Sequence, residues 1–126
     1  MKQIHNTHAA PAAIGPYNQA NEAGGMLFIS GQIALNPATG ELVQDDIATE
    51  TRQVLNNLQA IVENAGLTLA NIVKCSVFVK DMADYAAINA VYAEYFAADT
   101  APARELVQVS ALPRYVNVEI SAIAVR

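Results

Sequence analysis

Residues 46–65 read Asp-Ile-Ala-Thr-Glu-Thr-Arg-Gln-Val-Leu-Asn-Asn-Leu-Gln-Ala-Ile-Val-Glu-Asn-Ala, and residues 72–80 read Ile-Val-Lys-Cys-Ser-Val-Phe-Val-Lys. In the first stretch, apolar side chains recur at helical intervals on one face, which predicts an amphipathic helix. Asp45 or Asp46 can cap its start, and Gly66 can end it in a left-handed conformation. The second stretch is rich in β-branched and aromatic residues, which predicts a strand.

Further elements are predicted on both sides of these stretches. Strands are expected at residues 26–33, 104–112 and 116–125. Gly24-Gly25 is read as a hairpin turn, and Asp81 is expected to cap a second helix. The apolar and aromatic residues that recur along this helix are Met82, Tyr85, Ile88, Val91, Tyr92, Tyr95 and Phe96.

The element order predicts a single α+β domain over residues 1–126, with two helices on one face of a mixed sheet. Alternation along the last strand places inward Val116, Val118, Ile120, Ala122 and Ala124. Glu119 then lies on the opposite face, together with Ile123 and Val125. Because no further helix is available to cover these apolar residues, another copy of the chain is the simplest cover.

Composition excludes several classes of protein. A net charge of −5 argues against general nucleic-acid binding, which needs basic surface. No apolar window approaches the roughly 18 residues of a membrane span. The first six residues lack the apolar centre of a signal peptide, and the single cysteine, Cys75, excludes an internal disulfide framework. These features favour a cytoplasmic location.

Two charged residues stand in apolar surroundings near the end of the chain, in Pro102-Ala103-Arg104 and Val118-Glu119-Ile120. Burying an unpaired charge is costly, so such residues suggest a small polar site. An arginine fork suits a carboxylate, which it can hold with two parallel hydrogen bonds. The pattern predicts a pocket for a small organic acid with Arg104 as its anchor, although a structural ion pair of Arg104 is an open alternative.

Other reactive groups receive no catalytic role from the pattern. His5 and His8 are too few and too poorly placed for a metal site, and no glycine-rich phosphate loop occurs. We therefore expect neither a metal nor a cofactor. Cys75 lies in an apolar strand and is expected to be a buried, inert thiol. Ser30 has no nearby histidine in the sequence to activate it as a nucleophile.

Six ordered sequence blocks resemble the RidA family, also called YjgF, of reactive-intermediate deaminases. The blocks are residues 10–17 (APAAIGPY), 30–33 (SGQI), 36–41 (NPATGE), 77–81 (VFVKD), 102–104 (PAR) and 118–120 (VEI). The resemblance implies a homotrimer of chorismate-mutase-like subunits, whose sheets face a central barrel and whose sites lie between subunits. It also implies cofactor-free hydrolysis of imines or enamines, such as 2-aminoacrylate and 2-iminobutanoate, to 2-keto acids and ammonia.

The resemblance also assigns roles to single residues. Arg104 matches the arginine that holds the substrate carboxylate, and Glu119 matches the glutamate that positions or activates water. The other matching positions form the pocket wall or lie near the cleft; they are Tyr17, Ser30, Gly31 and Asn89. The backbone carbonyl of Leu106 is expected to orient a water. A surface polar role is an open alternative for Asn89.

The chain departs from the family pattern at two places. Glu105 and Leu106 follow the Pro-Ala-Arg block, where well-known members carry a small residue and a cysteine. The stretch 96–101 before this block is shorter than usual. Since neighbouring side chains of a strand face opposite sides, Glu105 is expected to point away from Arg104.

Two other functions are compatible with the same resemblance. The first is a regulatory trimer that binds small keto acids as a sensor, without useful turnover. The second is an RNA-cleaving translation inhibitor, which the acidic balance and the lack of a basic patch disfavour.

Overall fold

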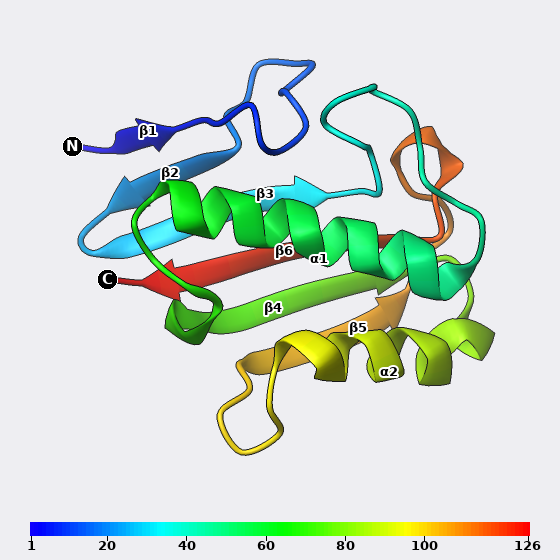
Figure 1. Cartoon of the computed structure of the whole chain (residues 1–126). Coiled ribbons are helices and arrows are strands. Elements are labelled where there is room, and N and C mark those ends of the chain that lie inside the picture. Colours follow the sequence, from blue (N-terminus) through cyan, green and yellow to red (C-terminus); the bar gives the residue numbers. More distant parts are fainter.

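The protein is a two-layer α+β structure in a computed structural model that describes residues 1–126 (Figure 1). The strands are β1 (Gln3–His5), β2 (Ala20–Ala23), β3 (Met26–Gln32), β4 (Ile72–Val79), β5 (Ala103–Gln108) and β6 (Val118–Val125). They form one sheet in the order β1-β2-β3-β6-β4-β5. Strands β4 and β5 are parallel, and all other neighbours are antiparallel. The predicted mixed sheet is confirmed.

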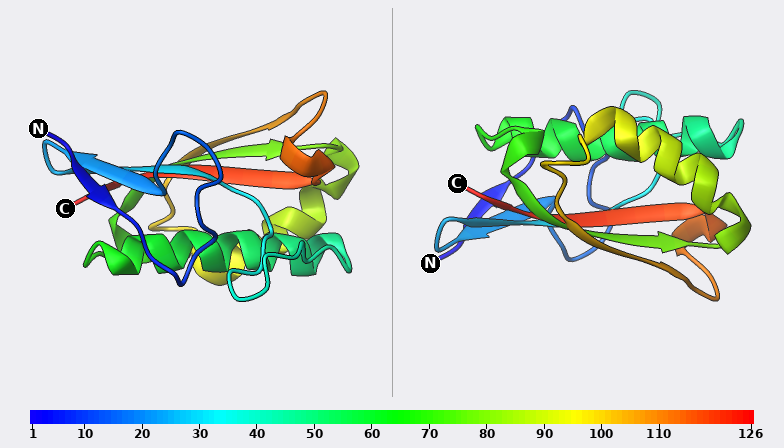
Figure 2. Two further views of the ribbon diagram at one scale, coloured as in Figure 1. Left: turned by 90° about the horizontal axis from the view of Figure 1, so that it is seen from above. Right: turned by 90° about the horizontal axis from the view of Figure 1, so that it is seen from below.

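Helices α1 (Ile47–Asn64) and α2 (Tyr85–Tyr95) form a single layer on one face of the sheet (Figure 2). The Asp46 carboxylate accepts a hydrogen bond of 2.7 Å from the backbone N–H of Thr49 and caps α1. Gly66 follows the helix with a φ of 80°, as predicted. The apolar stripe of α1 packs on the sheet because its residues are spaced at helical intervals. None of the helices is long and apolar enough to cross a membrane.

Several element boundaries differ from the prediction. Asp81 caps a short 3₁₀ turn at Met82–Asp84, so α2 itself begins only at Tyr85. The last two strands are shorter than predicted, because Pro113 and the positive φ angles of Arg114 and Tyr115 form a turn between them. Strand β1 was not predicted. Its three residues carry no periodic signal, and it forms by pairing with β2.

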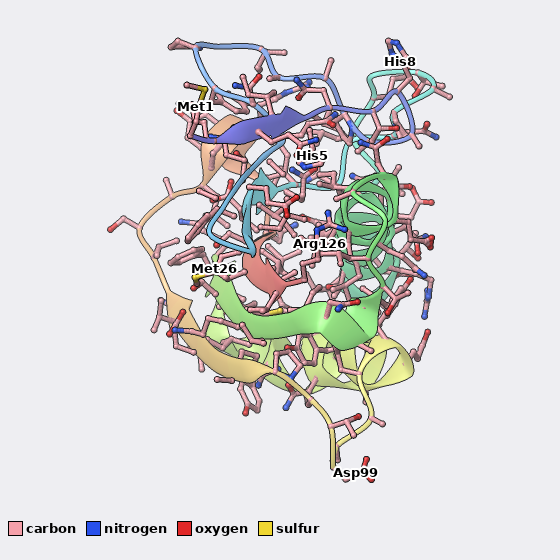
Figure 3. All side chains as sticks on the ribbon, turned by 90° about the vertical axis from the view of Figure 1, so that its left-hand side faces the viewer. Met1, His5, His8, Met26, Asp99 and Arg126 are labelled. Atoms are coloured by element: carbon pink, nitrogen blue, oxygen red, sulfur yellow. The ribbon has the colours of Figure 1, made fainter.

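The alternation predicted for β6 is confirmed, and its second face is open. All five inward residues are buried, whereas Glu119 and Ile123 are only half-buried and Val125 is exposed. Phe28 and Met26 lie on the same open face in the register of β3 against β6. Figure 3 shows Met26 on the side of the sheet away from the helices. The open face is therefore partly apolar.

A buried carboxylate connects the first turn of α1 to the start of β6. The Glu50 side chain is 1% exposed and accepts two hydrogen bonds of 2.8 Å from Asn117, one from its backbone N–H and one from its side-chain amide. Because charge-assisted bonds are the stronger ones, they fix the chain just before Glu119.

The last residue of the chain connects the other end of the sheet to α1. The Arg126 guanidinium donates two hydrogen bonds to the Glu22 carboxylate, at 2.8 and 2.9 Å, and one to the backbone carbonyl of Ala65. Hydrogen bonding from Arg126, with a smaller contribution from His5, lowers the pKa of Glu22 to about 2. Figure 3 shows His5 and Arg126 close together. This contact joins β1, β2 and β6.

Candidate functional site

The predicted site residues separate into two groups. Tyr17, Gly31 and Glu119 line one cavity, which we call the Glu119 cleft. Arg104, Asn89 and Leu106 lie together at β5 and α2, which we call the arginine edge. Ser30 lies next to the cleft without lining it.

In the Glu119 cleft the carboxylate lies directly against the backbone of Gly31. A Cβ atom at position 31 would approach the Glu119 Cδ atom to 2.9 Å, which is closer than real Cβ contacts allow. The register of β3 against β6 shifts between Ile29 and Gln32, so Gly31 lies in an irregular part of the strand pair. Glycine is required here for close approach and not for an unusual φ angle.

The cleft has room for a small ligand. Its volume is about 110 Å³, enough for several water molecules or one small organic acid. The Tyr17 side chain, 49% exposed, forms part of the wall. Arg114 also lines the cavity, and the turn with positive φ angles places it there. Sequence reasoning missed Arg114, because nothing in the local pattern predicts this turn conformation.

Glu119 is a carboxylate without a partner. It makes no hydrogen bond or ion pair within the chain, and it is half-buried. Burial raises the pKa of Glu119 because it disfavours the charged form. A carboxylate of raised pKa beside a cavity is suited to accept a proton and return it.

Ser30 and Gln19 hold the loop that carries Tyr17. The Ser30 hydroxyl donates a hydrogen bond of 2.6 Å to the backbone carbonyl of Asn18. The buried Gln19 side chain donates to the carbonyls of Thr7, Ala10 and Pro11 and accepts from the N–H of Thr7. Sequence reasoning missed Gln19, since a single glutamine in a loop gives no signal of burial.

At the arginine edge, Arg104 has no anionic partner. Its Nη1 donates a hydrogen bond of 2.8 Å to the side-chain oxygen of Asn89. Its guanidinium carbon lies 4.7 Å from the centre of the Tyr92 ring. None of the ion pairs in the chain includes Arg104. The chain therefore contains no structural ion pair of Arg104, and most of its N–H donors have no partner.

The two residues after Arg104 follow strand alternation. Leu106 is half-buried and packs against the core beneath the helices. Glu105 points to the open face, where it forms an ion pair of 2.8 Å with Lys74 and accepts a hydrogen bond from Ser76. Hydrogen bonding from Lys74, followed by that from Ser76, lowers the pKa of Glu105. The prediction that Glu105 points away from Arg104 is confirmed. The loop before β5 has Asp99 at its tip (Figure 3).

The Glu119 cleft and the arginine edge lie on opposite faces of the sheet. Arg104 pairs in register with Cys75, whose side chain is buried beneath the helices. Glu119 pairs with Phe78 on the open face. A ligand held by Arg104 of one chain cannot reach Glu119 of the same chain. Cys75 is buried as expected, and burial is the largest cause that raises the pKa of its thiol. No group of three or more His, Cys, Asp and Glu side chains could hold a metal ion.

Comparison with known proteins identifies the family. The family model described as Endoribonuclease L-PSP matches residues 7–126. The chain belongs to this family, which includes the RidA and YjgF proteins. A curated relative from Escherichia coli strain K12, named 2-iminobutanoate/2-iminopropanoate deaminase, is 53% identical over 128 residues. The match covers 100% of this chain and 99% of the relative.

Solved structures of the family share the fold. The YjgF gene product of Escherichia coli is 51% identical to this chain, with a TM-score of 0.92. TdcF of the same organism, solved with bound serine, is 47% identical, also with a TM-score of 0.92. Each match covers 98% of this chain and 98% of the solved chain. The family and the fold expected from the sequence are both confirmed.

Proposed function

We propose that the protein hydrolyses short-lived enamines and imines, such as 2-aminoacrylate and 2-iminobutanoate, to 2-keto acids and ammonia. The relative named as such a deaminase covers the whole chain. The observation that carries the proposal is the half-buried Arg104, whose N–H fork has no anionic partner in the chain. A planar fork that is already oriented is suited to the carboxylate that all these substrates carry.

In the proposed reaction, Arg104 holds the substrate carboxylate with two parallel hydrogen bonds. An enamine first gains a proton on carbon to become the imine. Water then attacks the imine carbon, and its proton passes to the Glu119 carboxylate. Glu119 returns the proton to the amino nitrogen. The C–N bond then breaks while the hydroxyl group of the intermediate gives its proton to the Glu119 carboxylate, so that the keto acid and ammonia leave. Because the protonated imine is already electrophilic, positioning and modest base catalysis suffice, and the proposed chemistry uses no cofactor.

The remaining predicted residues have supporting roles in this proposal. Tyr17 and Gly31 form the wall that contains the attacking water. Ser30 supports the Tyr17 loop through Asn18, and its hydroxyl can turn to the substrate. Asn89 acts on the substrate through Arg104, because its side-chain oxygen is bound to the guanidinium. The Leu106 carbonyl orients a water.

The proposed active site forms between subunits of a homotrimer. Since Arg104 and Glu119 lie on opposite faces of one sheet, the arginine edge of one subunit must meet the Glu119 cleft of another. The partly apolar open face, with Phe28 and Val125, would be covered in the trimer. Light scattering on the purified chain should give a mass about three times the 13.4 kDa of one subunit. A stable monomer at micromolar concentration would contradict the shared site.

A mixing experiment tests the shared site itself. When the inactive variants Arg104→Ala and Glu119→Gln are refolded together in equal amounts, about a quarter of the sites should combine wild-type Arg104 with wild-type Glu119. Activity should therefore return to about a quarter of the wild-type value. Each variant refolded alone is the control. If the mixture stays as inactive as its parts, both residues act within one subunit or not at all.

The reaction is tested with a threonine dehydratase that releases 2-iminobutanoate. Addition of the purified chain should accelerate keto-acid formation, whereas the dehydratase alone gives the uncatalysed rate. Binding of 2-oxobutanoate is measured on the same preparation by calorimetry. Tight binding without acceleration would contradict the deaminase and support the regulatory sensor.

A further inference from the structure

Three side chains of α2 surround the Arg104 guanidinium. Tyr85, Asn89 and Tyr92 are spaced four and three residues apart, which places them on one face of the helix. This face is turned toward β5, since Asn89 binds Arg104 at 2.8 Å. The guanidinium carbon lies 4.7 Å from the centre of the Tyr92 ring and 6.0 Å from that of Tyr85.

We propose that Tyr92 is a positioning residue, whose ring holds the Arg104 guanidinium in the orientation that binds the substrate carboxylate. This inference rests on the proposed function and adds a residue to it. An arginine side chain has several rotatable bonds, and β5 is an edge strand with only β4 beside it. The single hydrogen bond to Asn89 fixes one nitrogen, but it leaves the plane of the fork free to turn. A ring face at 4.7 Å restricts that rotation by cation–π attraction.

The Tyr92 ring is itself held firmly. Tyr92 is 7% exposed, and its ring centre lies 4.7 Å from that of Phe96 in a tilted arrangement. The aromatic face at Arg104 is therefore part of the core. Such a fixed support keeps an arginine oriented before the substrate arrives, which lowers the ordering cost of binding.

The hydroxyl group of Tyr92 does not explain the proposed role of this residue. It is buried and makes no hydrogen bond of ordinary geometry, and the weakly polar thiol of Cys75 lies beside it. Burial, followed by the neighbouring thiol of Cys75, raises the pKa of Tyr92 far above the neutral range, so the phenol stays protonated. A buried hydroxyl without a partner gives no stabilisation. What Tyr92 contributes is its ring, and phenylalanine should supply that equally well.

The test compares two variants at this position by binding of 2-oxobutanoate and by turnover of 2-iminobutanoate. Tyr92→Phe keeps the ring, so both KM and the dissociation constant should stay within about twofold of wild type. Tyr92→Leu keeps apolar bulk but removes the ring face. It should weaken binding and raise KM by about fivefold to thirtyfold, with a smaller change in kcat. Leu27→Ala is the control for lost core packing, because it truncates a buried side chain on β3, which is separated from β5 by β6 and β4. It should lower the melting temperature similarly and change binding by less than about threefold.

A double-mutant cycle shows whether Tyr92 acts through Arg104. In an Arg104→Ala background, Tyr92→Leu should have no further effect on 2-oxobutanoate binding. An equal loss in that background, or an equal loss in Tyr92→Phe, would overturn the proposal. If Tyr92→Leu weakens 2-oxobutanoate binding but the wild type shows no turnover, the deaminase is contradicted and the positioning role of Tyr92 is still supported. Turnover in the wild type, together with an unchanged KM in Tyr92→Leu, would support the deaminase and contradict the positioning role of Tyr92.

Discussion

Replacing Arg104 by alanine is expected to lower kcat/KM for 2-iminobutanoate by about two to four powers of ten. The variant loses both hydrogen bonds to the substrate carboxylate, and each bond to a charged group contributes about 1.5–3 kcal/mol. Arg104→Lys keeps the charge but loses the planar fork, so it should lose one bond and about one to two powers of ten. Steady-state kinetics in the dehydratase-coupled assay measures both variants.

Folding should survive these changes, because Arg104 makes one hydrogen bond and no ion pair within the chain. Melting temperature and mass are measured beside activity. Arg52→Ala is the matched control, since it removes an exposed arginine that pairs with Glu94 at 3.1 Å. It should change neither activity nor assembly. Full activity in Arg104→Ala would remove the anchor from the proposed mechanism, and loss of activity together with loss of the trimer would make Arg104 structural.

The second large effect is expected for Glu119→Gln, which should lower kcat by about a hundredfold while 2-oxobutanoate still binds. The amide keeps the shape of the side chain beside Gly31 but cannot accept a proton from water. Glu63→Gln, an exposed change on α1, is the control and should leave kcat unchanged. Wild-type turnover in Glu119→Gln would mean that backbone groups alone handle the water.

The pH dependence gives Glu119 a second test. Because burial raises its pKa, the wild type should lose activity on acidification at a higher pH than an ordinary glutamate would cause. The residual activity of Glu119→Gln should not show this loss of activity in acid.

The burial of Glu119 also affects stability. The folded state binds the Glu119 proton more tightly than the unfolded state does, so stability falls as pH rises through the raised pKa. The variant should therefore melt higher than the wild type at neutral pH, and the difference should shrink in acid. An unchanged difference would contradict the burial of this carboxylate.

Helix α1 and strand β6 show what local sequence can predict. The start of α1 after Asp46, the left-handed Gly66 and the two faces of β6 all follow from periodicity and from single-residue preferences. The direction in which Glu105 points also follows from alternation alone. These features depend on residues within a few positions of one another, so the local sequence pattern is enough to predict them.

Features that depend on contacts between distant segments could not be predicted from the sequence. Strand β1 exists because β2 lies beside it, and its residues carry no pattern of their own. The turn that brings Arg114 to the Glu119 cleft depends on two positive φ angles, at Arg114 and Tyr115, which neither residue type predicts. The hydrogen bonds of Ser30 and Gln19 likewise join segments that the sequence does not relate.

The sequence by itself determined the family and the α+β class, and it singled out two charged residues, Arg104 and Glu119, as site candidates. Alternation also placed Glu119 on the outer face of the last strand, but only the tertiary structure decided on which face Arg104 lies relative to it. Strand register places Arg104 beside Cys75 under the helices and Glu119 beside Phe78 on the open face. Alternation gives each strand two faces, but which face of β5 meets the helices depends on its register with β4. That long-range pairing separates the two charges within one chain, and it is the physical reason to expect the site between subunits.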